Sequence, residues 1–150
     1  MANQVHHYFS IFTSLFFRYK VVVKKLKKLL GKAEFIALTS DLWKNKKLEY
    51  FLAITAHFFD RGLNFRSIII SFRKFRERHF AANISEFITK ELERYLILDK
   101  CVSLTTDNEA TVRRAANDLN PGIIEALSCL AHNLNLSVND AFGLWKRFVI

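Results

Sequence analysis

Phe35-Ile-Ala-Leu-Thr-Ser-Asp-Leu-Trp43 is the stretch that decides the fold, and Cys101-Val-Ser-Leu-Thr-Thr-Asp-Asn108 repeats its plan. Each begins as an apolar run and reaches a carboxylate, which is typical of a strand that leads to a polar edge. Strand side chains alternate between two faces, so Asp41 shares a face with Thr39, and Asp107 has the same phase in the second stretch. If the two strands lie parallel and adjacent, both carboxylates reach the crevice where open α/β sheets place their chemistry.

The segments on either side of the first stretch have helix and hairpin patterns. Between Tyr19 and Leu30, apolar residues recur at three- and four-residue spacing among lysines, which predicts an amphipathic helix. Tyr50–Phe59 and Leu63–Phe75 are rich in β-branched and aromatic residues, and Asp60-Arg61-Gly62 separates them. We therefore expect a hairpin with a short, glycine-containing loop.

The second half of the chain alternates helix and strand. Asn83-Ile-Ser-Glu86 resembles a capping box and predicts the start of a helix that leads into the strand ending at Asp107. A short helix is expected over Glu109–Leu119, Ile123–Cys129 fits no single pattern, and Leu130–Phe148 is mostly helical in pattern. Three strands in a meander, then a helical crossover to a fourth strand beside the first, is the plan of a ribonuclease-H-like core. The expected fold is thus α/β, a mixed sheet of a three-strand antiparallel meander plus a parallel strand, flanked by helices.

The composition indicates one globular domain with an anionic partner. The chain has 150 residues, 51% of them hydrophobic, with 15 Phe, 4 Gly and 1 Pro, unlike a low-complexity or disordered chain. Its net charge of +9 favours a polyanion as partner, with nucleic acid ahead of an anionic membrane. Two cysteines are too few for a disulfide framework, which indicates the nucleus or cytosol. We expect residues 1–33 to form a basic helical segment and residues 34–150 to form the ribonuclease-H-like part.

Basic residues gather in two places. Seven basic residues and no acid lie between Arg18 and Lys32, and the second hairpin arm ends in an arginine-rich run. A solvated surface is the simpler interpretation for any one of them, and a DNA-facing surface is the functional one. The apolar stretch Tyr8–Phe17 is not expected to be a signal peptide or membrane span, because no basic residue precedes it and Arg18 follows too soon. The candidate DNA-binding residues are Lys24, Lys25, Lys27, Lys28, Arg73, Lys74, Arg76 and Arg78.

The two carboxylates suggest phosphoryl-transfer chemistry. A two-metal site needs carboxylates that share a pair of divalent ions, and Asp41 and Asp107 supply two of them. Either residue alone is more often a turn or helix-cap residue, and Asp107 also fits the cap of the helix that follows it. Cys129 and His132 stand three apart but form only half of a zinc site, since no second pair with suitable spacing is present.

Several short motifs carry a family resemblance. In this order and at these distances they resemble the catalytic core of hAT-family transposases, which includes the transposase-derived BED zinc-finger proteins. The resemblance runs from about Tyr8 to about Asp140. The motifs are Asp41-Leu-Trp43, Thr55-Ala-His57-Phe58, Phe72-Arg-Lys-Phe75 with His79 and Asn83-Ile84, Thr105-Thr-Asp107-Asn108, and Cys129-Leu-Ala-His132-Asn-Leu-Asn-Leu136.

The resemblance implies a ribonuclease-H-like fold and DNA cut-and-paste chemistry with Mg²⁺ or Mn²⁺. Asp41 and Asp107 stand at the positions of the family's first two acidic metal ligands. Cys129 and His132 match its Cys-x-x-His motif, whose histidine lies beside the active site near the DNA end. The family's third acid, a Glu beyond a helical insertion domain, has no counterpart in these residues. DNA as partner, a nuclear location and a possible homo-oligomer are implied as well, with neither a membrane nor a small-molecule substrate.

Three functional hypotheses follow from these observations. The first is a transposase-core fragment that is inactive alone because the third ligand is missing. The second is a non-catalytic, domesticated or decayed module that binds DNA or another protein through its basic surface. The third is a small nuclease complete in itself, which requires another acid in the crevice, with Glu109 and Asp140 as candidates.

Overall fold

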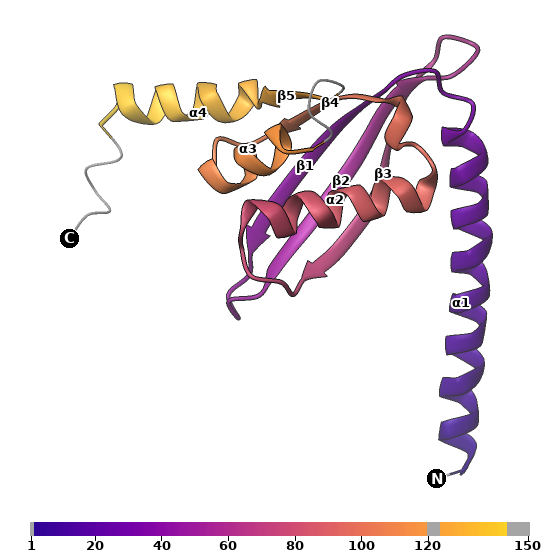
Figure 1. The fold of residues 1–150 in the computed structure, drawn as a ribbon. Coiled ribbons are helices and arrows are strands. Elements are labelled where there is room, and N and C mark those ends of the chain that lie inside the picture. The colour runs from indigo at the N-terminus through magenta and orange to yellow at the C-terminus, as the bar shows by residue number, and fades with distance from the viewer. Residues whose placement is uncertain (1, 120–123, 144–150) are drawn as a thin grey trace.

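A computed structural model describes residues 2–119 and 124–143, with side chains from residue 13 onward. Its described part contains one sheet of five strands in the order β3-β2-β1-β4-β5 (Figure 1). The elements are α1 (Ala2–Leu30), β1 (Ile36–Lys44), β2 (Tyr50–Phe59), β3 (Phe65–Phe75), α2 (Ala81–Tyr95), a 3₁₀ turn (Leu98–Lys100), β4 (Cys101–Thr106), α3 (Ala110–Asn117), β5 (Glu125–Ser128) and α4 (Leu130–Ala141).

The strand directions confirm the expected fold class. β1, β2 and β3 form an antiparallel meander, and β4 pairs parallel with β1. β5, which lies in the segment with no single pattern, extends the parallel part of the sheet beside β4. The crossover from β3 to β4 runs through α2, so β1 and β4 become neighbours although 56 residues, 45–100, lie between them in the sequence.

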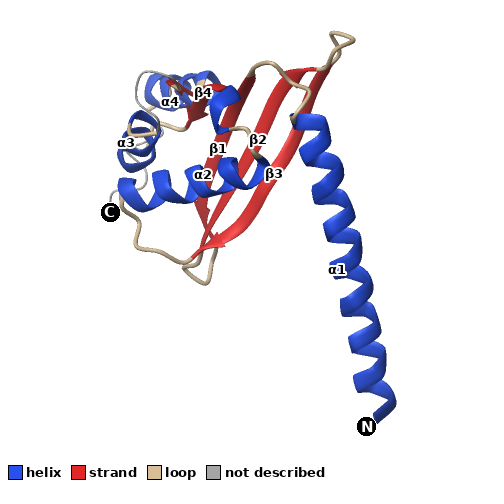
Figure 2. Cartoon of the chain, turned by 45° about the vertical axis from the view of Figure 1, so that its right-hand side comes forward, coloured by secondary structure: helices blue, strands red, loops and turns tan. Residues whose placement is uncertain are grey.

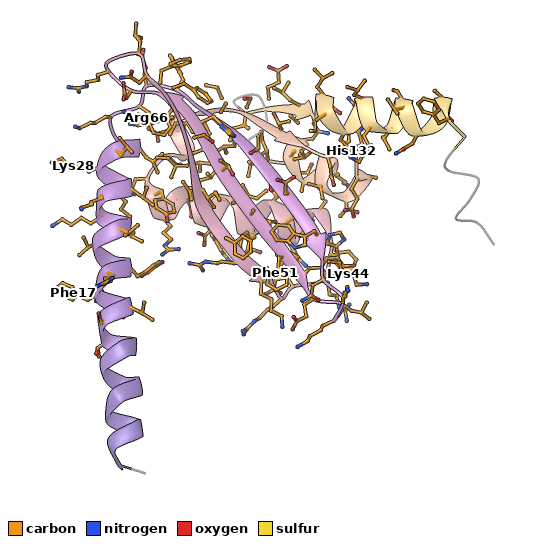
Figure 3. The ribbon with its side chains drawn as sticks, turned by 180° about the vertical axis from the view of Figure 1, so that it is seen from behind. Phe17, Lys28, Lys44, Phe51, Arg66 and His132 are labelled. Carbon is orange, nitrogen blue, oxygen red and sulfur yellow. The ribbon has the colours of Figure 1, made fainter. Side chains whose placement is uncertain are left out.

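The hydrophobic core lies between one face of the sheet and the helices. β1 alternates buried and accessible residues, with Leu38, Ser40 and Leu42 on the buried face. Ile84, Ile88 and Leu92 form the buried stripe of α2, which lies across that face (Figure 2). Seen from behind, the other face of the sheet is not covered by any of the described helices (Figure 3). Asp41 belongs to this open face, because it alternates with the buried residues of β1.

Two helix boundaries differ from the sequence-based expectation. α1 begins at Ala2 rather than at Tyr19, because neither Gly nor Pro interrupts the helical spacing of apolar residues upstream. It ends at Leu30, and Gly31 closes it by donating its backbone N–H to Lys27 O at 2.9 Å, as expected. α4 is described as far as Ala141, and residues 144–148 of the expected helix lie outside the described residues. None of the helices in the described part is long and apolar enough to cross a membrane.

The capping box at Asn83 is a wrong prediction. α2 begins two residues earlier, with Phe80 as a cap that makes no side-chain hydrogen bond. The Asn83 side chain donates to Arg78 O at 2.7 Å, and Glu86 pairs with Lys90 at 2.6 Å. The chain turns sharply after β3, so Asn83 stabilises that turn instead of the helix end.

We predict that Leu38→Ala destabilises the domain by about 2–5 kcal/mol, because its side chain is fully buried in the central strand and its removal leaves a cavity. Leu130→Ala is the matched control: that leucine is 80% exposed, and its truncation is expected to cost no more than about 0.5 kcal/mol. Urea unfolding followed by circular dichroism measures both. Equal losses of unfolding free energy for the two variants would contradict the burial of Leu38.

Candidate active site at the carboxyl edge of the parallel strands

Asp41 and Asp107 stand side by side beyond the last parallel pair of β1 and β4. The register joins Thr39 to Thr105 and Ser40 to Thr106, and each aspartate is the next residue. Both line one cavity of about 670 Å³. The cavity is lined by Thr39, Ser40, Asp41, Leu42, Trp43, Thr105, Thr106, Asp107, Cys129 and His132. The structure thus brings together all four residues that the sequence placed at the site.

β1 does not lead out of the sheet after Asp41. It continues to Lys44, because β2 still pairs with it, and Asp41 lies opposite Ala53. Asp41 is therefore held by a strand, with an exposed side chain on the open face of the sheet. In the part of the chain that the structure describes, its carboxylate makes no hydrogen bond or ion pair, so both oxygens remain available to a ligand.

Asp107 occupies the loop between β4 and α3. Its Oδ1 accepts the backbone N–H of Glu109 at 3.2 Å, which is a short turn of the kind that Asp favours. Glu109, rather than Asp107, is the cap residue of α3, and it makes no side-chain capping bond. The turn therefore uses one carboxylate oxygen of Asp107 and orients the other, which is compatible with a ligand role.

Cys129 and His132 reach the cavity from the first turn of α4. Cys129 is the cap residue of this helix, and its backbone N–H donates to Thr106 O at 2.8 Å. This bond continues the pairing of β5 with β4 and fixes the start of α4 beside Asp107. The three-residue spacing then places His132 on the same wall of the cavity.

A ring of hydrogen bonds that the sequence analysis did not find holds this corner together. Asn133 Nδ2 donates to Ser128 Oγ at 3.0 Å, Ser128 Oγ donates to Asn108 Oδ1 at 2.5 Å, and Asn108 Nδ2 donates to Asn133 Oδ1. The ring joins the loop after β4, the end of β5 and the first turn of α4. Asn108 and Asn133 stand next to the proposed site residues in sequence, but nothing in a linear pattern shows that their side chains meet.

The two further acids considered for the crevice do not line the cavity. Glu109 pairs with His79 Nδ1 at 3.4 Å, on the side of α3 that faces α2, and Asp140 lies near the end of α4. Among residues 2–119 and 124–143, no group of three or more His, Cys, Asp or Glu side chains is arranged to hold a metal ion. The third hypothesis, a nuclease complete in itself, thus finds no support from either residue.

The donors that are present suit one hard cation. Mg²⁺ and Mn²⁺ prefer carboxylate oxygens, and Mg²⁺ commonly uses one or two protein carboxylates together with waters and substrate phosphates. Asp41 and Asp107 fit that pattern. A two-ion site requires further carboxylates, which the cavity lining does not include.

The two basic groups lie at opposite edges of the sheet. β3 runs in the same direction as β1, since both are antiparallel to β2, so the arginine-rich end of β3 lies at the edge that carries Asp41. α1 leads into the start of β1, and its lysines belong to the other edge. In Figure 3, Lys28 and His132 are on opposite sides of the molecule. The fold therefore does not join the two basic groups into one continuous surface for DNA.

Four basic residues lie at or just after the end of β3, and two of them have acidic partners. Arg73 pairs with Glu91 at 3.3 Å and Lys74 pairs with Glu49 at 2.5 Å. Arg76 and Arg78 are exposed and form no ion pair within the described residues. They are the stronger candidates for phosphate contacts.

The meander, the parallel fourth and fifth strands and the paired aspartates define a ribonuclease-H-like domain. Comparison with known families agrees, because the ZBED1 RNase-like domain matches residues 39–133. The chain belongs to this family. The matched segment begins at Thr39 in β1 and ends at Asn133 in α4, so it contains both aspartates and the Cys129–His132 pair.

A curated relative extends the comparison. The chain is 26% identical over 130 residues to the protein named "Putative transcriptional regulator tpeD" of Talaromyces stipitatus. The similarity covers 80% of this chain and 15% of the relative. The chain therefore corresponds to a small part of that protein.

We predict that iodoacetamide at pH 8 modifies Cys129 and spares Cys101 in the folded chain. Cys101 is fully buried, and desolvation raises the pKa of its thiol to about 12. Because the thiolate is the reactive form and the pKa is raised, only about one thiol in ten thousand is ionised at pH 8. Cys129 is partly exposed at the cavity. Mass spectrometry of timed digests measures both sites, urea is expected to make both react, and rapid labelling of native Cys101 contradicts the prediction.

Proposed function

We propose that the chain is the ribonuclease-H-like core of an hAT-type transposase module, and that it binds DNA at the edge carrying Asp41 and Asp107. Alone, it is expected neither to cleave nor to join strands. The observation that carries this proposal is the placement of two carboxylates, one from β1 and one after β4, in a single cavity with Cys129 and His132. Membership of the ZBED1 RNase-like family supports the proposal of a transposase-derived core.

In this proposal Asp41 and Asp107 together hold a divalent cation, Mg²⁺ or Mn²⁺, against a DNA phosphate. A bound ion of this kind lowers the charge on the phosphate and stabilises an attacking or leaving oxygen. The chain's own residues supply the placement: β1 holds Asp41, the turn to Glu109 orients Asp107, and the hydrogen-bonded corner holds the start of α4, which carries His132 into the cavity. Two carboxylates without a third leave the site incomplete, which is the reason for expecting no cleavage.

The strand-end basic residues are proposed as the phosphate contacts nearest to the site. Arg76 and Arg78 follow β3 at the same edge of the sheet as Asp41, and exposed arginines bind phosphate with little dependence on base sequence. The lysines of α1 lie at the other edge and would contact a separate stretch of nucleic acid. A nuclear location follows from DNA as the partner.

A second candidate function is a non-catalytic regulatory module. One observation favours it: the relative in Talaromyces stipitatus is named as a transcriptional regulator. In this version the same edge binds DNA, and the aspartates are retained without catalysis. The chain spans 15% of that relative, so the activity of a whole protein of that kind is proposed and not shown for this chain.

We predict DNA binding that weakens steeply with salt and is largely independent of sequence. The double variant Arg76→Gln, Arg78→Gln is expected to reduce the slope of log K against log salt by about two, since each phosphate contact contributes about one. Fluorescence anisotropy with a short duplex measures this. The matched control, Lys24→Gln with Lys25→Gln, removes the same charge at the other edge. If the control reduces binding more than the strand-end variant, α1 is the footprint instead.

We predict that the chain binds Mn²⁺ weakly through Asp41 and Asp107 and leaves duplex DNA intact. The missing third carboxylate lowers both ion affinity and transition-state stabilisation. The binding readout is Mn²⁺-induced broadening of the two aspartate backbone resonances, which Asp41→Asn and Asp107→Asn should each diminish. The activity readout is strand cleavage of terminal-repeat and random duplexes in Mn²⁺.

Cleavage by the unmodified chain that both substitutions abolish contradicts the expectation of inactivity. It means that a third ligand is recruited within these residues, and Glu109 is the first to test because its backbone N–H already binds Asp107, although its side chain would have to leave His79. Absence of Mn²⁺ broadening at both aspartates favours the non-catalytic regulatory candidate.

A further inference from the structure

Three aromatic rings cluster on the open face of the sheet, one from each strand of the meander. Trp43 on β1 lies opposite Phe51 on β2, with ring centroids 6.0 Å apart. Phe72 on β3 completes the cluster, with its ring centroid 5.4 Å from that of Trp43 and 6.2 Å from that of Phe51. Trp43 is 39% exposed and Phe72 is 61% exposed, and Figure 3, which looks onto this face, labels Phe51. A group of large apolar side chains left in water is typical of a binding surface.

This aromatic cluster is continuous with the candidate site. Strand side chains alternate between faces, so Trp43 shares a face with Asp41 and lies roughly 7 Å further along β1. Trp43 also lines the cavity that contains both aspartates. In the neighbouring row, Phe72 lies opposite Ala53, which in turn lies opposite Asp41. A ligand held at Asp41 therefore meets the rings without leaving the open face.

The charge beside the aromatic cluster indicates what the rings bind. Arg76 and Arg78 follow β3 at the end of the sheet where the cluster lies, with Glu77 between them in the sequence. Both arginines are exposed and form no ion pair within the described residues. An aliphatic partner surface would use neither the positive charge nor the flat rings. A single strand of nucleic acid uses both, because its phosphates bind cations and each base has a flat face that stacks on an aromatic ring.

We propose that Trp43, Phe51 and Phe72 form a stacking platform for the unpaired bases of a DNA strand whose phosphates lie at the Asp41 edge. This platform rests on the DNA binding proposed above and specifies the form of the DNA, which is single-stranded where it meets the sheet. In a duplex the base faces are covered by neighbouring bases, so the rings gain access only to unpaired nucleotides. Stacking does not read the hydrogen-bonding edges of bases, so little preference among base types is expected.

Strands with and without bases test the stacking. A thymidine strand of about twelve nucleotides and an abasic strand of the same length carry the same phosphate charge, so a difference in affinity comes from the bases. The unmodified chain is expected to bind the thymidine strand at least about tenfold more tightly, since stacking contributes roughly five- to hundredfold per base. The fluorescence of Trp43, measured in a Trp145→Phe background, should be quenched by the thymidine strand and not by the abasic one.

Substitutions on β3 separate ring stacking from simple apolar contact. Phe72→Leu keeps an apolar side chain but removes the ring, and is expected to lower the affinity for the thymidine strand at least about fivefold, whereas Phe72→Trp should retain it. Ile69→Ala is the matched control, because Ile69 is 62% exposed on the same face of β3, opposite Thr55, and has no ring. It should bind like the unmodified chain. Circular dichroism checks that all variants remain folded.

The results that overturn the platform differ from those that overturn DNA binding. Equal affinity for the thymidine and abasic strands overturns the platform, and so does an unchanged affinity of Phe72→Leu; either result leaves the face to a protein partner. A duplex of the same length is titrated in parallel. If it still binds, the proposed function stands without the platform, and if neither the strands nor the duplex bind at low salt, both proposals are overturned.

Discussion

The in-register parallel pairing of β1 with β4 is the constraint on which the candidate site depends. Thr39 lies opposite Thr105 and Ser40 opposite Thr106, so the next residue of each strand is an aspartate and the two reach the same cavity. A shift of one residue in this register would turn one aspartate toward the helices, because side chains alternate between faces. Buried Leu38 and Leu104, opposite each other in the same pair of strands, resist that shift because both belong to the core.

The candidate site combines one residue from a strand with three residues from a loop and the start of a helix. Asp41 is held within a strand that β2 continues to pair, whereas Asp107, Cys129 and His132 come from the loop after β4 and from the first turn of α4. Those loop and helix residues are held by the Asn108–Ser128–Asn133 ring and by the Cys129–Thr106 backbone bond. One wall of the site is therefore held by the backbone pairing of the sheet, and the other wall depends on side-chain hydrogen bonds.

The basic residues are divided between two edges of the sheet. The open edge with the aspartates also has the exposed arginines that follow β3, while the lysines of α1 belong to the opposite edge. The net charge of +9 therefore does not describe a single basic face. Within α1 the basic charge is confined to the later part of the helix, since residues 2–17 contain no Lys, Arg, Asp or Glu.

The sequence by itself determined the fold class, the meander, the crossover and the expectation that Asp41 and Asp107 meet, because alternation in strands and helical spacing are local properties. Cys129 and His132 were expected beside them only from the family resemblance. It also indicated that two strands with one plan, Leu-Thr-Ser-Asp and Leu-Thr-Thr-Asp, belong together. Only the tertiary structure decided that β1 continues past Asp41, that Asn83 serves a turn, and that the two basic groups belong to opposite edges of the sheet. Each of these depends on which segments become neighbours across the sheet, and that is set by pairing and packing between residues far apart in the chain.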